Sequence, residues 1–207
     1  MIKQEWRKQE KNYYAPSECP QVIEIPGFNY FCISGKGNPN HAFFAEYVGT
    51  LYTLSYAVKM DLKKKNIPGQ PDYTVYPLEG VWQFENDTPL SPDGILNKDA
   101  LIFNLMIRQP DTVSKEYAQE ILEHVKKKKA NPLWDQVKFE HMTDGLCVQA
   151  LHIGSYDREA ESFAQMEIFA AQQGRIRTGM DHREIYLSDA RKTTPEKLRT
   201  ILRFQVQ

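Results

Sequence analysis

The feature that most constrains the fold is the order in which strand and helix patterns follow one another. After residue 20, a strand pattern is followed by a helix and two more strands, and after a connecting helix the same order returns. The repeat rests on this order of elements rather than on sequence identity between the halves. We therefore expect two similar halves, each a strand-helix-strand-strand unit, with a ligand cleft at the seam between them.

Hydrophobic periodicity and turn residues give the ranges of these elements. Between residues 41 and 65, apolar side chains recur at three- and four-residue steps, as one buried helix face requires. Ser114 suits the N-cap of the connecting helix, and Asp157 suits the N-cap of the next one. The expected strands lie within 22–37 and at 73–85, 99–109, 136–142, 146–154, 182–188 and 199–206; the expected helices lie at 41–65, 114–130 and 157–172; a turn-rich segment covers 86–94.

The domain boundaries follow from the same patterns. Residues 1–20 are polar and charged and are expected to form an N-terminal arm or a short helical lead-in. Residues 21–207 are expected to form a single domain, with a first half at about 21–112, a connector helix at about 114–130 and a second half at about 136–207.

Charge and cysteine content exclude several classes of function. The 26 Lys and Arg residues nearly balance the 27 Asp and Glu residues, so the chain lacks the basic field that direct nucleic-acid binding needs. The three cysteines are an odd number at wide spacings, which favours reduced thiols. No segment approaches the roughly 20 apolar residues of a membrane span. We expect a cytoplasmic protein that contacts neither nucleic acid nor membrane.

Known catalytic and cofactor motifs are absent from the sequence. It contains no phosphate-binding glycine loop, nucleophile elbow, two-histidine zinc helix or dinucleotide fingerprint. The five histidines lack the spacing of metal ligands. We therefore expect neither a metal nor a cofactor.

The most informative segment is 182–189. In a strand, alternation places His182, Glu184 and Tyr186 on one face, opposite Ile185. A carboxylate between aromatic side chains is a candidate ligand-binding group. The alternative is that this face meets solvent and that Glu184 is an ordinary exposed carboxylate.

Two further segments contain candidate ligand-binding residues. In the second predicted strand, Tyr76, Glu79 and Trp82 lie near Pro77 and Gly80, which interrupt a regular strand and favour a bend. The alternative for Trp82 is an ordinary core position.

The segment 147–159 leaves a strand through Gly154 and enters a helix. This path places Tyr156 where a strand ends and a helix begins, which is a common place for binding residues. Gly154 and Asp157 are more simply explained as structural.

These three segments, with 106–111 and 195–203, resemble in their order the stand-alone bacterial branch of the GyrI-like small-molecule-binding family. The resemblance spans most of the chain and implies an α+β fold, a pseudo-twofold pair of strand-helix-strand-strand units. It also implies a ligand cleft between the halves, lined by aromatic side chains around a central glutamate, which Glu184 matches. The sequence departs from the family's usual pattern at Ser155, Asp181 and Ala190, which lie beside the proposed cleft residues.

The resemblance implies three kinds of activity, because such proteins act as drug-sensing domains, as a gyrase modulator or as hydrolases of cyclopropane-bearing DNA-alkylating compounds. We expect binding of flat aromatic, cationic or electrophilic ligands, with Glu184 as general base if the ligand is hydrolysed. The hydroxyl of Tyr156, which is the catalytic candidate, or that of Tyr76 or Tyr186 would then donate to the ligand carbonyl. The remaining ligand-binding candidates are Tyr76, Glu79, Trp82, His182 and Tyr186. The alternative is a protein that binds or sequesters drugs, or modulates gyrase, without catalysis.

Overall fold

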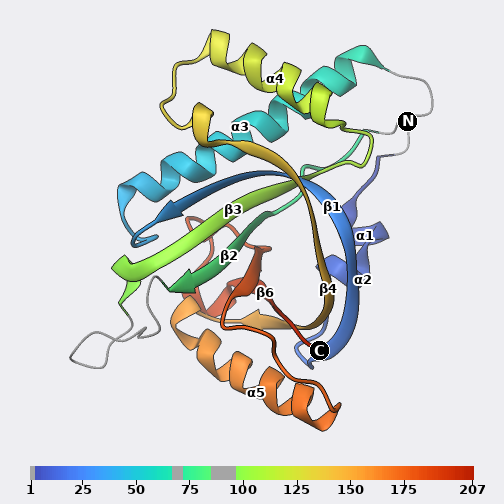
Figure 1. Cartoon of the computed structure of the whole chain (residues 1–207), viewed down its shortest axis with the longest axis vertical. Coiled ribbons are helices and arrows are strands. Elements are labelled where there is room, and N and C mark those ends of the chain that lie inside the picture. The colour runs from blue at the N-terminus through green and yellow to red at the C-terminus, as the bar shows by residue number, and fades with distance from the viewer. Residues whose placement is uncertain (1–2, 67–71, 85–96) are drawn as a thin grey trace. The chain divides into compact units, whose positions relative to one another are not determined.

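The computed structural model describes residues 3–66, 72–84 and 97–207 and shows an α+β protein (Figure 1). Its strands are β1 (Gln21–Lys36), β2 (Leu78–Phe84), β3 (Leu101–Gln109), β4 (Lys138–Ile153), β5 (His182–Tyr186) and β6 (Arg199–Gln205). Its α-helices are α1 (Trp6–Gln9), α2 (Lys11–Tyr14), α3 (Ala42–Lys65), α4 (Lys115–Lys128) and α5 (Glu159–Gln172). The order β1-α3-β2-β3, then α4, then β4-α5-β5-β6 confirms the predicted fold class and its repeated strand-helix-strand-strand order.

Residue contacts divide the chain into two compact units. Unit 1 comprises residues 1–4, 28–78 and 82–142, and unit 2 comprises residues 5–27, 79–81 and 143–207. Strands β1, β2 and β4 each contribute residues to both units. The predicted boundaries of an arm and a single domain remain a prediction.

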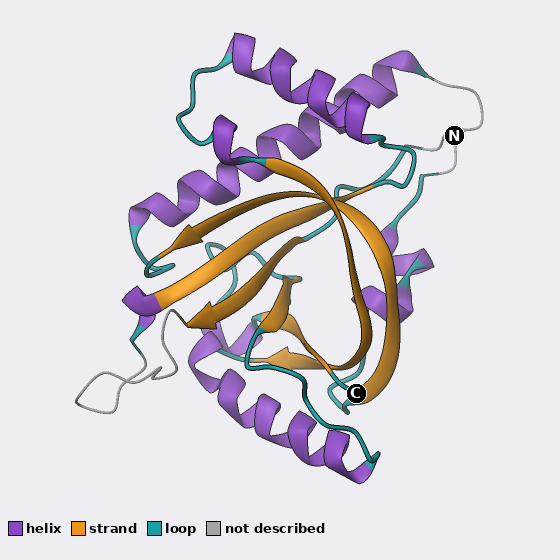
Figure 2. Cartoon of the chain, in the orientation of Figure 1, coloured by secondary structure: helices purple, strands orange, loops and turns teal. Residues whose placement is uncertain are grey.

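In unit 1, β1 pairs with β3 in antiparallel register, from Asn29 opposite Gln109 to Lys36 opposite Ile102. Helix α3 buries one stripe of side chains at helical spacing, and the Ser55 hydroxyl on that stripe accepts a hydrogen bond of 3.0 Å from Gln109 Nε2. Figure 2 shows α4 running beside α3. As predicted, the Ser114 hydroxyl caps α4 by accepting a hydrogen bond from the Tyr117 N–H.

An aromatic cluster fills part of the unit 1 core. The Trp82 ring lies 5.9 Å from the Phe44 ring and 5.6 Å from the Phe103 ring, measured between centroids. Trp82 is buried, and its ring contacts are those of a core residue. A core position was the alternative to a ligand-binding role in the sequence analysis.

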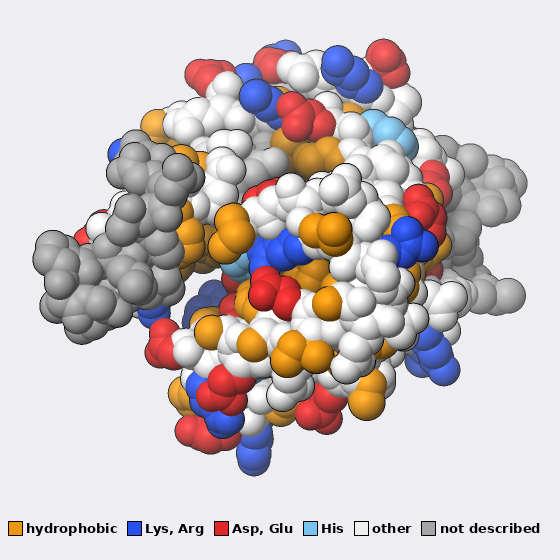
Figure 3. Space-filling view, turned by 60° about the horizontal axis from the view of Figure 1, so that its bottom comes forward, with side chains coloured by type: hydrophobic (Ala, Val, Ile, Leu, Met, Phe, Trp, Pro, Cys, Tyr) orange, Lys and Arg blue, Asp and Glu red, His pale blue; other side chains and the backbone are white. Residues whose placement is uncertain are grey.

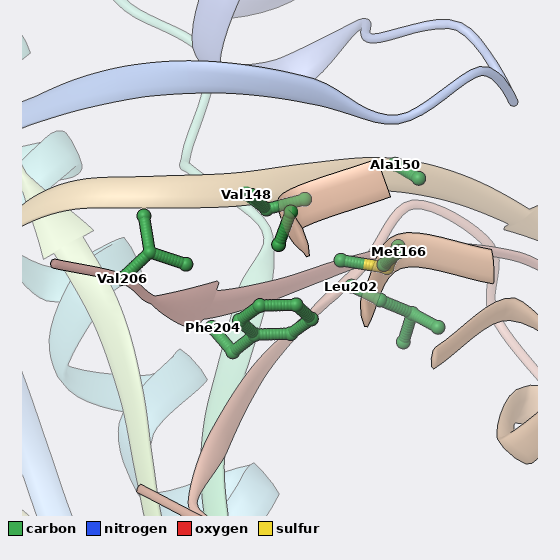
Figure 4. Close-up of a cluster of buried hydrophobic side chains, with 7 residues drawn as sticks. Val148, Ala150, Met166, Leu202, Phe204 and Val206 are labelled. Carbon is green, nitrogen blue, oxygen red and sulfur yellow. The ribbon is translucent and has the colours of Figure 1, made fainter. Parts of the chain in front are cut away.

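In unit 2, β6 is paired with both β4 and β5, and both pairings are antiparallel. Helix α5 packs its apolar stripe against this sheet (Figure 4). The buried cluster consists of Val148, Ala150, Met166, Ala170, Leu202, Phe204 and Val206. Apolar burial of this kind contributes about 1.5–3 kcal/mol for each large side chain, so the cluster fixes α5, and the residues at its start, on the sheet.

The N-terminal residues pack into unit 2 through two short helices. The Trp6 and Tyr14 side chains are buried, and their ring centroids lie 5.3 Å apart. The Gln149 side-chain amide donates a 2.6 Å hydrogen bond to the Asn12 carbonyl. The segment is therefore a helical lead-in that is packed against β4.

Three local predictions need correction. The two strands expected at 136–142 and 146–154 form one continuous strand, β4, in which Gly145 takes a positive φ of 68° instead of ending the strand. Asp157 does not cap a helix, because residues 156–158 form a 3₁₀ turn and Arg158 occupies the N-cap of α5. Strand β2 begins at Leu78 rather than at residue 73. The predicted turn at 86–94 lies outside the described residues.

Figure 3 shows acidic and basic side chains interspersed on one face of the molecule, in keeping with the formal net charge of -1. Among the described residues, no helix combines the length and the hydropathy that a membrane-spanning segment requires.

Candidate functional site

Glu184 lies in the middle of β5, opposite Leu202 of β6. It is only 8% exposed, so the alternative of an ordinary solvent-facing carboxylate is wrong. Its neighbours Arg183 and Ile185 are also buried, and strand alternation directs them to the opposite face. A carboxylate in such a position requires partners, because burying an unpaired charge is costly.

The first partner is His182, two residues earlier on the same face of β5. Its Nε2 lies 3.0 Å from Glu184 Oε1. In the tautomer that carries its hydrogen on Nε2, the imidazole donates to this carboxyl oxygen. The imidazole packs edge-on against the ring of Phe163 from α5, with 4.6 Å between centroids, and this contact fixes the histidine beside Glu184.

The second partner is Glu159, the first residue of α5. Its side chain is 7% exposed and is hydrogen-bonded to the carboxyl group of Glu184. Burial, the charge of Glu184 and the hydrogen bond to it raise the pKa of Glu159 well above the ordinary value. A helix N-terminus favours an ionised carboxylate by only about 0.3–1 kcal/mol, whereas two unit charges about 4 Å apart near a protein surface repel by about 4 kcal/mol. These influences shift Glu159 toward its protonated form.

Two tyrosines complete the group. The rings of Tyr156 and Tyr186 meet edge to face, with 6.0 Å between their centroids. Partial burial and the nearby charge of Glu184 raise the pKa of Tyr156 to about 12, so its hydroxyl keeps its proton and can donate. Gly154 adopts a φ of 143° just before this turn, a conformation that favours glycine. Tyr156 is 38% exposed and so is open to a ligand.

The structure thus brings together four of the predicted site residues, Glu184, His182, Tyr156 and Tyr186, and adds Glu159. Sequence reasoning missed Glu159, because a glutamate in the first turn of a helix is usually explained by the helix dipole alone. The available signal was its position three residues after Tyr156, which places both side chains around the same turn.

Glu79 is buried in a different set of contacts. Arg183 Nη1 lies 2.9 Å from Glu79 Oε2, and Arg183 Nη2 lies 2.6 Å from Asp144 Oδ1. The Tyr14 hydroxyl donates a 3.3 Å hydrogen bond to Glu79. Because Arg183 and Glu184 point to opposite faces of β5, Glu79 is held on the face away from Glu184 and is paired with Arg183. Burial raises the pKa of Glu79, although the charges of Arg183 and Arg203 act to lower it.

Tyr76 and Trp82 belong to unit 1 and have partners there. The Arg108 guanidinium lies 4.6 Å from the centre of the Tyr76 ring and 3.4 Å from that of Phe28. Both Tyr76 and Trp82 are buried. Their predicted role as ligand-binding residues remains a prediction.

Two adjoining cavities of about 310 and 460 Å³ lie in unit 1. They share Lys115, Phe139 and Glu140, and neither is lined by any of the predicted site residues. Within the described part of the chain, no cluster of His, Cys, Asp and Glu is arranged to hold a metal ion.

Comparison with solved structures finds close relatives over the full chain. An uncharacterized conserved protein from Listeria innocua is 34% identical with a TM-score of 0.88, covering 99% of this chain and 100% of its own. Two structures described as hydrolases from Listeria innocua are 32% and 33% identical with TM-scores of 0.84 and 0.86, covering 99% and 100% of this chain and 100% of their own. No curated protein matches the sequence.

The sequence model of the GyrI-like small molecule binding domain matches residues 19–207. This range includes both strand-helix-strand-strand repeats and all the residues around Glu184. The chain therefore belongs to the GyrI-like small-molecule-binding domain family.

Proposed function

We propose that this protein binds flat aromatic cations, or flat electrophiles, with Glu184 as the central anionic group. The observation that carries the proposal is the burial of Glu184 beside His182 and Glu159, with the Tyr156 ring near its carboxyl group and in contact with the Tyr186 ring. An aromatic cation gains both from the carboxylate charge and from the electron-rich faces of tyrosine. A neutral ligand of the same shape gains only the ring contacts.

Titration with a fluorescent aromatic monocation such as ethidium tests this function. Glu184→Gln removes the charge while keeping the shape, and we expect it to weaken binding about tenfold or more. Glu161→Gln is the matched control, because it removes a charge from a side chain of α5 that is 62% exposed. Equal affinities for the wild type and Glu184→Gln would contradict the proposal.

Hydrolysis is a second candidate function, and the specific observation in its favour is that two relatives 32% and 33% identical over the full chain are described as hydrolases. With a cyclopropane-bearing electrophile, Glu184 takes a proton from water as the water oxygen bonds to a ring carbon. The strained C–C bond breaks, and its electron pair moves to the conjugated carbonyl, whose oxygen accepts a hydrogen bond from Tyr156. That oxygen then takes a proton from solvent, and Glu184 releases to solvent the proton that it took from the attacking water. The product is the ligand plus one water molecule.

Mass analysis of such a ligand after incubation separates an enzyme from a binding protein. An enzyme adds the mass of one water, whereas a protein that only sequesters the ligand returns it unchanged. We expect Glu184→Gln to lower turnover about 10²–10⁴-fold and Tyr156→Phe to lower it about 10²-fold, with Glu161→Gln as control. Turnover by Glu184→Gln at the wild-type rate would exclude Glu184 as the base.

A further inference from the structure

We infer that Glu159 is a neutral positioning residue whose carboxylic acid donates a hydrogen bond to Glu184, so that the pair holds one proton and presents one negative charge to the ligand. This inference rests on the proposed function for the ligand, but its basis is the geometry around Glu159. It adds to the site a residue that selects for singly charged cations.

The Oε1 atom of Glu159, which is fully buried, lacks a hydrogen-bond donor among the described residues. A buried carboxylate would need such donors in place of the lost water, whereas a carboxylic acid needs fewer because it is uncharged.

The two glutamates differ in their hydrogen-bonding neighbours. Glu184 has a neighbouring ring nitrogen, His182 Nε2, 3.0 Å from one of its oxygens, and this nitrogen can donate to it, whereas Glu159 Oε1 has no such neighbour among the described residues. A proton on Glu159 supplies a further donor to the same carboxylate. The arrangement satisfies Glu184 as the charged member and leaves Glu159 as the neutral member of the pair.

The charged and titratable groups around Glu159 act in the same direction. Glu184 on β5 and Asp157 in the preceding turn are both acidic and both favour the protonated form of Glu159. Tyr156 keeps its proton and adds no charge. His182 contacts the Glu184 member of the pair through its Nε2 atom. A bound monocation, by contrast, favours loss of the shared proton, so cation affinity should rise with pH as Glu159 ionises.

The binding test compares wild type, Glu159→Gln and Glu161→Gln in ethidium titrations from about pH 6 to about pH 9. The glutamine amide can donate to Glu184 as the neutral acid does, so we expect Glu159→Gln to bind within about threefold of wild type at pH 7. Wild type and Glu161→Gln should bind more tightly as the pH rises, by at most about tenfold per pH unit for one proton released. The ethidium affinity of Glu159→Gln should not rise with pH in this way.

Two outcomes of the titration would overturn the inference. A loss of about tenfold or more in Glu159→Gln at pH 7 would mean that Glu159 is ionised and acts as a second anionic contact. An unchanged pH dependence in Glu159→Gln would mean that another group releases the proton.

An infrared measurement without ligand separates this inference from the proposed function. The C=O band of a protonated carboxylic acid should be present in wild type at neutral pH, should fade as the pH is raised, and should be lost in Glu159→Gln but kept in Glu161→Gln. If ethidium does not bind wild type but this band behaves as described, the proposed function fails and the proton assignment stands. If no such band is present in wild type, the assignment is wrong, whether or not the variant folds.

Discussion

At the scale of single residues, strand alternation in β5 directs two oppositely charged side chains, Arg183 and Glu184, to opposite faces. Arg183 enters a buried ion-pair network with Glu79 and Asp144, whereas Glu184 faces His182 and Glu159. Shifting the register of β5 by one residue would exchange these environments. The antiparallel pairing of β5 with β6 therefore positions the site as much as the side chains do.

The raised pKa of Glu159 gives a stability prediction with a definite sign. The folded chain binds this proton more tightly than the unfolded chain, so the unfolding free energy of wild type falls as the pH rises from the ordinary glutamate pKa, about 4.3, through the raised folded value. Glu159→Gln removes this contribution. Its stability relative to wild type should increase by up to about 1.4 kcal/mol per pH unit in that window.

Urea unfolding of both proteins at about pH 5 and about pH 8 measures this difference. Glu161→Gln is again the control, because its side chain is exposed and its difference from wild type should be small. If the unfolding free energies of Glu159→Gln and wild type differ by the same amount at both pH values, Glu159 does not have a raised pKa in the folded chain.

At the scale of elements, α5 carries Glu159 and is held to the sheet by the apolar cluster that includes Met166. Met166→Ala should lower the unfolding free energy by about 2–5 kcal/mol, because its side chain is fully buried and the variant leaves a cavity. Ile168→Ala on the same helix is the control, since Ile168 is 61% exposed and its change should be within about 0.5 kcal/mol. Urea denaturation checks both, and equal effects would contradict the assigned face of α5.

The elements were largely predictable from periodicity, and the errors have physical causes. Helix α3 was predicted to within one residue at its start because its apolar stripe is long and regular. Strand β4 was divided in two because glycine usually marks a turn, although a glycine at positive φ can also continue a strand. The contact between Glu184 and Glu159 was not predictable, because the 24 residues between them carry no local pattern that reports it.

At the scale of the whole molecule, the repeated order of elements and the family resemblance agree. The sequence resemblance pointed to the GyrI-like family, and the family match over residues 19–207 and the Listeria relatives bear it out. Near-neutral charge is consistent with a ligand that is a small molecule rather than a polyanion. The cleft between the halves, the cytoplasmic location and the roles of Tyr76 and Trp82 remain predictions.

The most direct measurement is a crystal structure with a bound aromatic cation that carries a heavy atom, so that its position is unambiguous. We predict that the cationic group lies within about 6 Å of the Glu184 carboxylate and of a tyrosine ring, the range over which a ring attracts a cation. A ligand bound only at the unit 1 cavities beside Lys115 and Phe139, with Glu184 still paired as in the ligand-free protein, would contradict it.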